Sequence, residues 1–335
     1  MTTTTTRSFL PNDIPLINAL TCCANLDCNK KAEPFTLKMC TACRSAHYCD
    51  VDCQKTHRKH HKHQCKQDAQ DIKVGTDEIA KSRHTKEKSN DSDCDDDNKL
   101  FQPILPKDDC PICTLPLPIN DSRSVYMTCC GNLICFSCGN EDRRVTLGRG
   151  QFPRCPFCRE PDPSSDEETL FRLKKRMEMN DKFAINMASQ YYESGEYGLS
   201  KDPQLAFDLC LRSAELGYSC AYFRAAIYYY NGEVVAKDMV KEREYLKKAA
   251  KKGHIKVRHN LGYDEWNNSN YRVACRHWLI SVAAGSTDSL TNIAKCYKFK
   301  FVKKEEYSTA LTSYIRVHKD EWSIERERAA DTVAP

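Results

Sequence analysis

Apolar side chains are distributed differently in the two halves of the 335-residue sequence. From about residue 168 to residue 320 they recur with the spacing of an amphipathic helix, alanine and tyrosine are abundant, and proline is almost missing. Residues 22–65 contain only six apolar side chains larger than alanine, cysteine set aside. The pattern predicts an all-α C-terminal half and an N-terminal half that cannot build an ordinary hydrophobic core.

Two further segments carry too little apolar surface to fold on their own. Residues 66–109 contain twelve acidic and eight basic side chains, with a run of aspartates between residues 91 and 97. Such a segment cannot offset the conformational entropy that ordering would cost. We expect residues 66–109 to form a polar, acidic linker whose start extends the last helix of the preceding module. We also expect residues 1–21 and 321–335 to be flexible ends.

The helical half repeats itself with a period near 36 residues. Each unit shows a glycine turn, an aspartate suited to an N-cap and a closing glycine suited to the left-handed position after a helix. The recurring residues are Gly195, Gly232, Asp202, Asp238, Gly217, Gly253 and Gly285. Two helices per unit at this period predict an α-solenoid of stacked helical hairpins, with an unrelated helical bundle as the alternative.

These repeats resemble the Sel-one-like repeats, relatives of the tetratricopeptide repeat, over residues 181–318. The units at residues 181–217 and 218–253 fit best. The third unit is shorter, and the fourth, at residues 286–318, rests on the helical pattern alone. The resemblance places a domain at residues 168–320 and implies that it holds a protein or peptide partner.

Seventeen of the 21 cysteines lie before residue 159. The N-terminus has no apolar run of the secretory type, and no stretch approaches the roughly 18 apolar residues of a membrane span. We therefore expect an intracellular protein of the cytoplasm or nucleus, without a membrane partner, whose paired cysteines bind metal instead of forming disulfides. The net charge of +5 is too small to imply nucleic acid, which is disfavoured as a partner.

The first cysteine cluster supplies eight ligands in short pairs, which suits two closed tetrahedral zinc sites. Its ligands are Cys23, Cys28, Cys40, Cys43, Cys49, Cys53, His61 and Cys65. Structural zinc contributes on the order of 10–16 kcal/mol to folding, enough to replace the missing core. A redox dithiol is the alternative for each pair, but eight ligands in series disfavour it.

The order of these ligands resembles a MYND-type zinc finger over residues 22–65. The resemblance implies an interleaved pairing in which Cys23, Cys28, Cys49 and Cys53 hold one ion and Cys40, Cys43, His61 and Cys65 hold the other. It also implies a peptide partner. The first pair is wider than usual, Arg58 stands where an aromatic residue is common, and Cys22 could replace Cys23. The basic run from Lys55 to Lys66 is either a solvated helix face or a phosphate-contacting patch.

The second cluster again supplies eight ligands, and its gaps resemble a RING-type zinc finger over residues 110–160. Its ligands are Cys110, Cys113, Cys129, Cys130, Cys135, Cys138, Cys155 and Cys158. The resemblance places the pairs at 110/113 and 135/138 on one ion, and the pair at 155/158 with the central pair on another. Asn132 stands where many RING fingers have histidine, so the adjacent Cys129 is expected to supply the fourth ligand. Together the two modules predict four zinc ions.

Three residues of the second module match positions by which RING-type ubiquitin ligases contact a ubiquitin-conjugating enzyme. They are Ile112, Pro156 and Arg159. The resemblance implies a ligase that positions the conjugating enzyme and its ubiquitin without a nucleophile of its own. The alternative is a non-catalytic zinc-finger scaffold that assembles protein complexes. A lysine methyltransferase is disfavoured because no SET-like motif is present.

Overall fold

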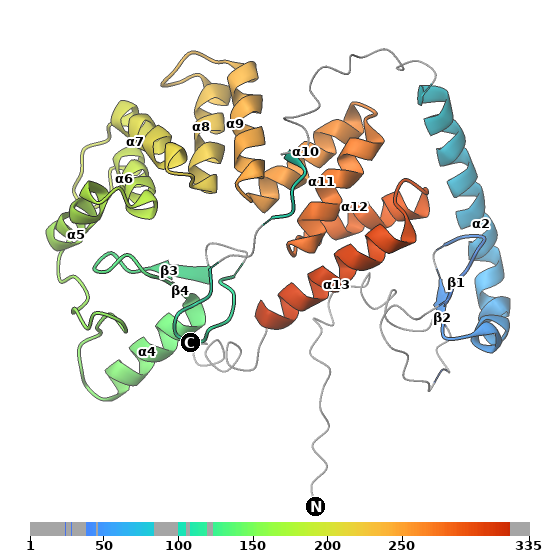
Figure 1. The fold of residues 1–335 in the computed structure, drawn as a ribbon, viewed down its shortest axis with the longest axis horizontal. Helices are drawn as coiled ribbons and strands as arrows, with labels where there is room; N and C mark the ends of the chain where they lie inside the picture. The colour runs from blue at the N-terminus through green and yellow to red at the C-terminus, as the bar shows by residue number, and fades with distance from the viewer. Residues whose placement is uncertain are drawn as a thin grey trace, which may run out of the picture. The chain divides into compact units, whose positions relative to one another are not determined.

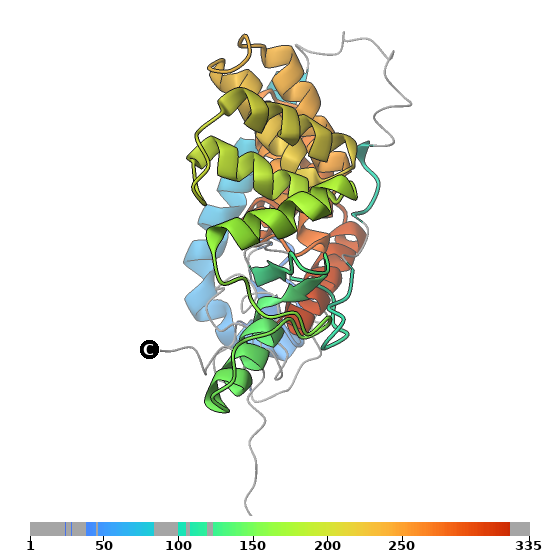
Figure 2. The ribbon, with the colours of Figure 1, turned by 90° about the vertical axis from the view of Figure 1, so that its left-hand side faces the viewer.

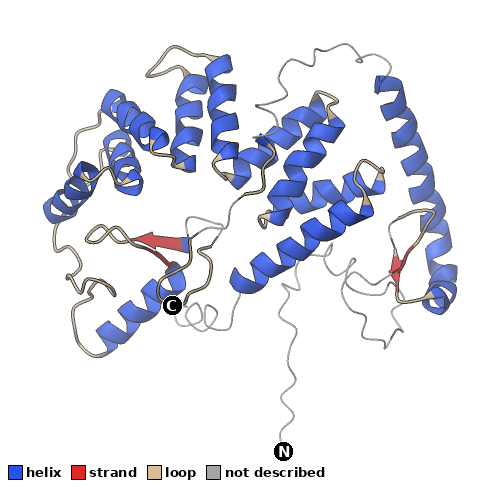
Figure 3. Ribbon diagram, in the orientation of Figure 1, coloured by secondary structure: helices blue, strands red, loops and turns tan. Residues whose placement is uncertain are grey.

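The computed structural model describes residues 24, 28, 38–44, 46–83, 100–104, 108–118 and 123–321. These residues form eleven helices and two short two-stranded sheets (Figures 1 and 3). The chain divides into two compact units, Met1–Cys94 with Gly262–Ile315 and Asp95–Leu261 with Arg316–Pro335. Among the described helices, none combines the length and apolar character that a membrane crossing demands.

Several sequence predictions fall outside the described residues. They concern the two ends, residues 1–21 and 322–335, and the cysteines Cys22 and Cys23. The middle of the predicted linker, residues 84–99, lies outside them as well.

The second unit contains a stack of antiparallel helices that continues from one hairpin to the next. Figure 2 shows its green to amber helices lying one above another. The helices are α5 (Asp166–Glu178), α6 (Lys182–Ser194), α7 (Pro203–Glu215), α8 (Ser219–Asn231) and α9 (Met239–Lys251), followed by α10 (Ile255–Asn267), whose residues up to Leu261 belong to this unit.

The predicted caps set the ends of these helices. The Asp202 side chain accepts a hydrogen bond from the backbone N–H of Leu205 at 2.9 Å, and Asp238 accepts one from Lys241 at 3.0 Å. The closing glycines have left-handed backbone conformations, as the sequence predicts: Gly217, Gly253 and Gly285. These capping predictions are confirmed.

Small side chains allow the helices of the stack to approach closely. Fully buried alanines line the interfaces: Ala184, Ala206, Ala221 and Ala225. Larger rings fill the space beside them, and Phe207 packs edge-on against Tyr228 with ring centroids 5.1 Å apart. The apolar period seen in the sequence therefore corresponds to buried clusters between successive helices, and the expected all-α solenoid is confirmed.

The end of the predicted linker is anchored on this stack. Leu100 is buried and packs against Ala250 and Val257. The guanidinium of Arg258 donates to the carbonyl oxygens of Leu100 at 2.8 Å and of Ala250 at 2.6 Å. Burial lowers the pKa of Arg258 to about 10. Residues 100–104 therefore belong to the folded unit, a feature that the polar composition of the segment conceals.

The first unit combines the first cysteine cluster with the last three helices, α11 (Tyr271–Ala283), α12 (Thr287–Lys298) and α13 (Lys304–Glu321). Its long helix α2 (Val51–Arg83) carries three of the metal ligands, Cys53, His61 and Cys65, and continues beyond residue 66, as expected for the start of the linker. Arg44 donates to the backbone oxygen of Tyr297 at 3.2 Å, and its guanidinium lies 5.6 Å from the centre of that ring. Asp68 pairs with Lys298 at 3.8 Å. The cysteine-rich module is thus attached to α12.

Each cysteine cluster contains one antiparallel hairpin. β1 (Lys38–Met39) pairs with β2 (His47–Tyr48), and β3 (Ser124–Tyr126) pairs with β4 (Leu133–Cys135). The second hairpin leads directly into α4 (Phe136–Gly148). Two or three residues per strand cannot form an independently stable sheet, so the hairpins need another source of stability.

Candidate metal centres

The described cysteines of the two clusters gather into four groups, whose ligand atoms lie within 4.8 Å of one another in each group. The groups are Cys28, Cys49 and Cys53; Cys40, Cys43, His61 and Cys65; Cys110, Cys113, Cys135 and Cys138; and Cys129, Cys130, Cys155 and Cys158. In both clusters the groups take ligands alternately along the chain. The arrangement coincides with the two interleaved pairings that the resemblances imply.

The distances between sulfur atoms fit tetrahedral zinc. Four thiolates about 2.3 Å from one ion stand about 3.8 Å apart. Cys28 lies 3.5 Å from Cys49 and 3.6 Å from Cys53. Cys23, the fourth ligand expected for this group, lies outside the described residues.

The second group joins a loop to helix α2. The Sγ atoms of Cys40 and Cys65 are 3.7 Å apart, and Cys43 Sγ lies 3.2 Å from His61 Nε2. His61 and Cys65 are one helical turn apart on α2, so both side chains reach the loop from the same face. Burial raises the pKa of the Cys40 thiol, but hydrogen bonds from the Cys43 backbone, the His61 side chain and the Ala42 backbone together lower it to about 6. The loop thus favours the thiolate that zinc requires.

The third group lies between the Cys110–Cys113 turn and the start of α4. Cys113 Sγ and Cys135 Sγ are 3.9 Å apart, and the backbone N–H of Cys135 donates to Cys110 Sγ at 3.4 Å. Burial raises the pKa of Cys110, but backbone hydrogen bonds from Cys135, Cys113 and Ile112 lower it to about 7. The donor set again stabilises a thiolate.

The fourth group contains the adjacent pair that the sequence leaves ambiguous. The structure brings both Cys129 and Cys130 together with Cys155 and Cys158, and Cys130 Sγ lies 3.7 Å from Cys155 Sγ. Asn132 is not a fourth ligand, because its side-chain amide donates to Cys130 Sγ at 3.3 Å. A hydrogen bond to a ligand sulfur is the usual role of a residue just outside a metal site.

Three of the ligand pairs share one backbone conformation, which the sequence does not reveal. The residue after the second cysteine adopts a left-handed conformation and is not glycine: Arg44, Thr114 and Arg159. Its backbone N–H donates to the carbonyl oxygen of the first cysteine, as from Thr114 to Cys110 at 2.7 Å. The tight turn leaves neighbouring N–H groups directed at the ligand sulfurs. Because this conformation costs energy for residues other than glycine, it indicates a loop held by its ligands.

The predicted contacts of a conjugating enzyme lie on two of these turns. Ile112 is 42% exposed on the first, whereas Pro156 is half-buried and Arg159 exposed on the second. The structure adds exposed apolar residues that the sequence analysis missed: Phe136, Leu147 and Phe152. Phe152, 85% exposed between α4 and the last ligand pair, has no signal in the sequence except its position between Gly150 and Pro153.

Within the part of the chain that the structure describes, the arrangement can hold metal and places no evident catalytic group beside it. Three of the groups supply four cysteine or cysteine–histidine ligands each, which leaves no open position and is typical of structural zinc. Three cysteines of the C-terminal helices, Cys210, Cys275 and Cys296, are buried there as small apolar side chains.

These features define a zinc-binding protein built from protein-interaction modules. More particularly, residues 23–65 match the family model of the MYND finger, and residues 182–218 and 221–254 match that of the Sel1 repeat. The MYND finger binds zinc, and these two predictions are confirmed. Residues 110–158 lie outside both matches.

The solved structures similar to this chain include two repeat proteins. A Sel1 repeat protein from Oxalobacter formigenes is 24% identical over 49% of this chain and 69% of its own, with a TM-score of 0.38. A protective antigen of uropathogenic Escherichia coli strains, displaying an SLR fold, is 18% identical over 59% of this chain, with a TM-score of 0.38. The chain spans 41% of that antigen. No curated protein matches the chain.

Proposed function

We propose that residues 110–160 form a RING-type module that recruits a ubiquitin-conjugating enzyme, while the MYND finger and the helical repeats bind the substrate. The observation that carries this proposal is the interleaved arrangement of the two ligand groups, one at Cys110–Cys138 and one at Cys129–Cys158. Interleaving fixes two loops on either side of α4, and both loops carry exposed side chains.

The same arrangement supports four zinc ions in the full chain, two per module. The four groups provide fifteen described ligands, and Cys23 completes the sixteen. Zinc in these sites supplies the folding free energy that the short hairpins lack. The protein's own contribution is to orient ligands and to shape the surface around them.

In the proposed reaction the module contributes position, not covalent chemistry. Ile112 offers an apolar contact to the conjugating enzyme, and the exposed Phe152 extends the apolar surface of the same module. The Arg159 guanidinium has five donors in a planar fork, so it can bridge the conjugating enzyme and its linked ubiquitin. Holding the two partners in one arrangement raises the fraction of reactive conformations and hence the rate of ubiquitin transfer.

The test is the discharge of ubiquitin from a panel of charged conjugating enzymes onto free lysine, with the purified full chain added. We expect acceleration by the wild type and its loss in Ile112→Ala or Arg159→Ala. Two matched controls should keep full activity: Phe171→Ala removes an exposed apolar residue from α5, and Arg149→Ala removes an exposed arginine from the same module.

Failure of the wild type to accelerate discharge from any enzyme of the panel, in a preparation that contains its zinc, would refute ligase activity. The non-catalytic scaffold would then account for the same modules, because MYND fingers and Sel1 repeats act in protein–protein interaction without a reaction of their own.

A further inference from the structure

Helix α5 directs two arginines at the second cysteine cluster. Arg172 and Arg176 are four residues apart, so both side chains leave the same face of the helix. Their side chains are only 11% and 19% exposed. Arginines on an ordinary solvated helix face are far more exposed, so both are engaged in packing.

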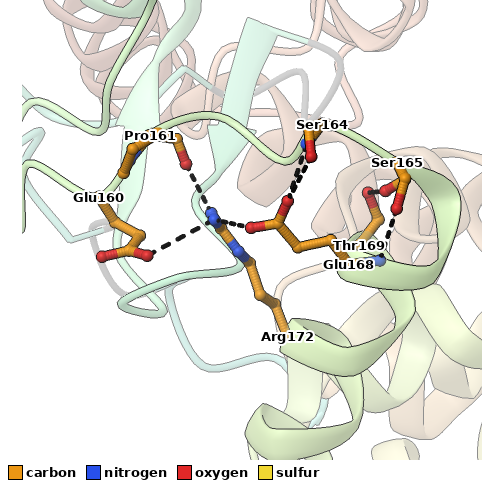
Figure 4. Close-up of polar contacts among 7 residues, drawn as sticks. All are labelled: Glu160, Pro161, Ser164, Ser165, Glu168, Thr169 and Arg172. Atoms are coloured by element: carbon orange, nitrogen blue, oxygen red, sulfur yellow. Dashed lines mark hydrogen bonds and ion pairs between the residues drawn. The ribbon is translucent and has the colours of Figure 1, made fainter.

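Arg172 holds the loop that follows the last ligand pair (Figure 4). Its guanidinium donates to the carbonyl oxygen of Pro161 at 2.8 Å and lies 3.6 Å from the carboxylate of Glu160. It also pairs with Glu168 on its own helix, and Glu168 is fixed in turn by the backbone and hydroxyl of Ser164, at 2.9 and 3.0 Å. The backbone oxygen of Glu160 accepts the N–H of Cys155 at 2.8 Å, so Arg172 contacts the segment that closes the Cys155–Cys158 turn.

Arg176 lies against the other ligand turn of the same centre. A Cβ atom added to Gly131 would stand 1.8 Å from its Nη2 atom, so the guanidinium fills the space that glycine leaves. Its Nη2 and Nε atoms donate to one carboxylate oxygen of Asp181 at 2.9 and 3.2 Å. The same oxygen accepts the hydroxyl of Tyr126 at 2.5 Å. The backbone N–H of Gly131 donates to Met127 at 2.7 Å, which closes the turn carrying the adjacent cysteines.

All four ligands of the fourth group lie on these two turns: Cys129, Cys130, Cys155 and Cys158. We propose that Arg172 and Arg176 are positioning residues of this centre, and that α5 braces its two ligand turns from the solenoid side. This inference rests on the proposed zinc occupancy of the fourth group. Two adjacent cysteines reach one ion only in a constrained turn, and a turn held from outside needs less reorganisation when metal binds.

The stabilisation between α5 and the metal site is reciprocal. If α5 favours the metal-competent arrangement of the turns, metal in the fourth group stabilises α5 by the same free energy. Asp181 extends the connection, because its second carboxylate oxygen accepts the backbone N–H of Phe183 at 3.0 Å and caps α6. The stability of α5 and α6 therefore depends on whether the fourth group holds its metal ion.

The experiment measures zinc release from the full chain into a chromophoric chelator. Wild type should release four ions slowly. In Arg172→Gln/Arg176→Gln, one ion of the four should leave at least about tenfold faster, as is common when groups outside the ligand shell are removed. Lys174→Gln, which removes an exposed cation from the same helix, should release zinc as the wild type does.

Hydrogen exchange identifies which centre has changed. Amides of residues 127–132 and 153–161 should lose protection in the double variant, while those of residues 110–116 keep it. If the double variant does not fold, Arg172→Lys and Arg176→Lys retain the charge without the planar fork, and each should show a smaller acceleration of one ion.

The outcomes distinguish the positioning role of the two arginines from the zinc assignment on which it rests. Four slowly released ions in every variant, or faster release of all four ions together, would overturn the brace. Fewer than four ions in the wild type would instead overturn the zinc assignment on which it rests.

Discussion

Replacing Gly131 by alanine should weaken the attachment of α5 and α6 to the second cysteine cluster far more than backbone strain alone would. Gly131 has a φ of +79°, and an added Cβ would meet the guanidinium of Arg176. A flexible arginine can swing away from the clash. Doing so breaks its ion pair with Asp181, whose carboxylate is only 10% exposed.

The expected loss has two parts. Alanine in a left-handed conformation costs about 1–2 kcal/mol. Hydrogen bonds between charged groups contribute about 1.5–3 kcal/mol, which the displaced Arg176 forfeits. We therefore expect Gly131→Ala to lower the local free energy of unfolding by about 2.5–5 kcal/mol, summing the two costs.

Gly150 provides a matched control in the same module. Its φ is +68°, and nothing lies within 4 Å of an added Cβ, so Gly150→Ala should cost only the backbone term. Native-state hydrogen exchange of residues 166–194 in the full chain measures the difference, since a multidomain chain has no single unfolding transition.

A double-mutant cycle tests the stated cause. In an Arg176→Ala background the clash is gone, so Gly131→Ala should add only about 1–2 kcal/mol of backbone cost. Equal effects of the Gly131 and Gly150 substitutions, or full additivity in the cycle, would refute the reasoning.

Three further predictions concern the rest of the fold. Gly262→Ala should destabilise the first unit by about 1–2 kcal/mol despite the better helix propensity of alanine, because the added Cβ would lie 2.6 Å from Nε1 of the buried Trp278. Gly148→Ala, whose added Cβ would meet nothing within 4 Å, should cause no such destabilisation. Chemical denaturation followed by tryptophan fluorescence checks both variants. Arg258→Met should change the unfolding free energy of the second unit by less than about 1 kcal/mol, because removal of the buried charge offsets the lost hydrogen bonds. The backbone amides of residues 100–104 should at the same time lose protection from hydrogen exchange. A loss of unfolding free energy above about 3 kcal/mol would contradict this prediction. Removing zinc with a strong chelator should leave the circular-dichroism signal of α7–α9 largely intact, because their alanine-rich core needs no metal; disappearance of the entire helical signal would count against it.

Local chemistry made much of the fold predictable. The N-caps at Asp202 and Asp238 and the left-handed Gly217 follow from residues within one helical turn, so their signals survive in a single sequence. Ligand spacing predicts that the cysteines bind metal, because two thiols across a short turn can face one ion. The pairing between distant turns came from resemblance, since spacing alone permits several combinations.

The structure adds contacts whose partners are far apart in the chain. Arg172 and Arg176 look like surface residues of a polar helix, and only the position of the ligand turns gives them a role. Leu100 ends a polar segment, yet Arg258, more than 150 residues later, fixes it. Asn132 stands where the resemblance to RING fingers would place a histidine, and its hydrogen bond to Cys130 depends on the side-chain arrangement of a single turn.

The zinc content of the purified full chain tests the central claim most directly. Mass spectrometry under native conditions should find four zinc ions per chain. The single variants Cys130→Ser and Cys40→Ser should each lose one, because their groups are separate. Two ions in the wild type, or a Cys130→Ser variant that still holds four, would contradict the assignment of residues 110–158 as a second two-zinc module.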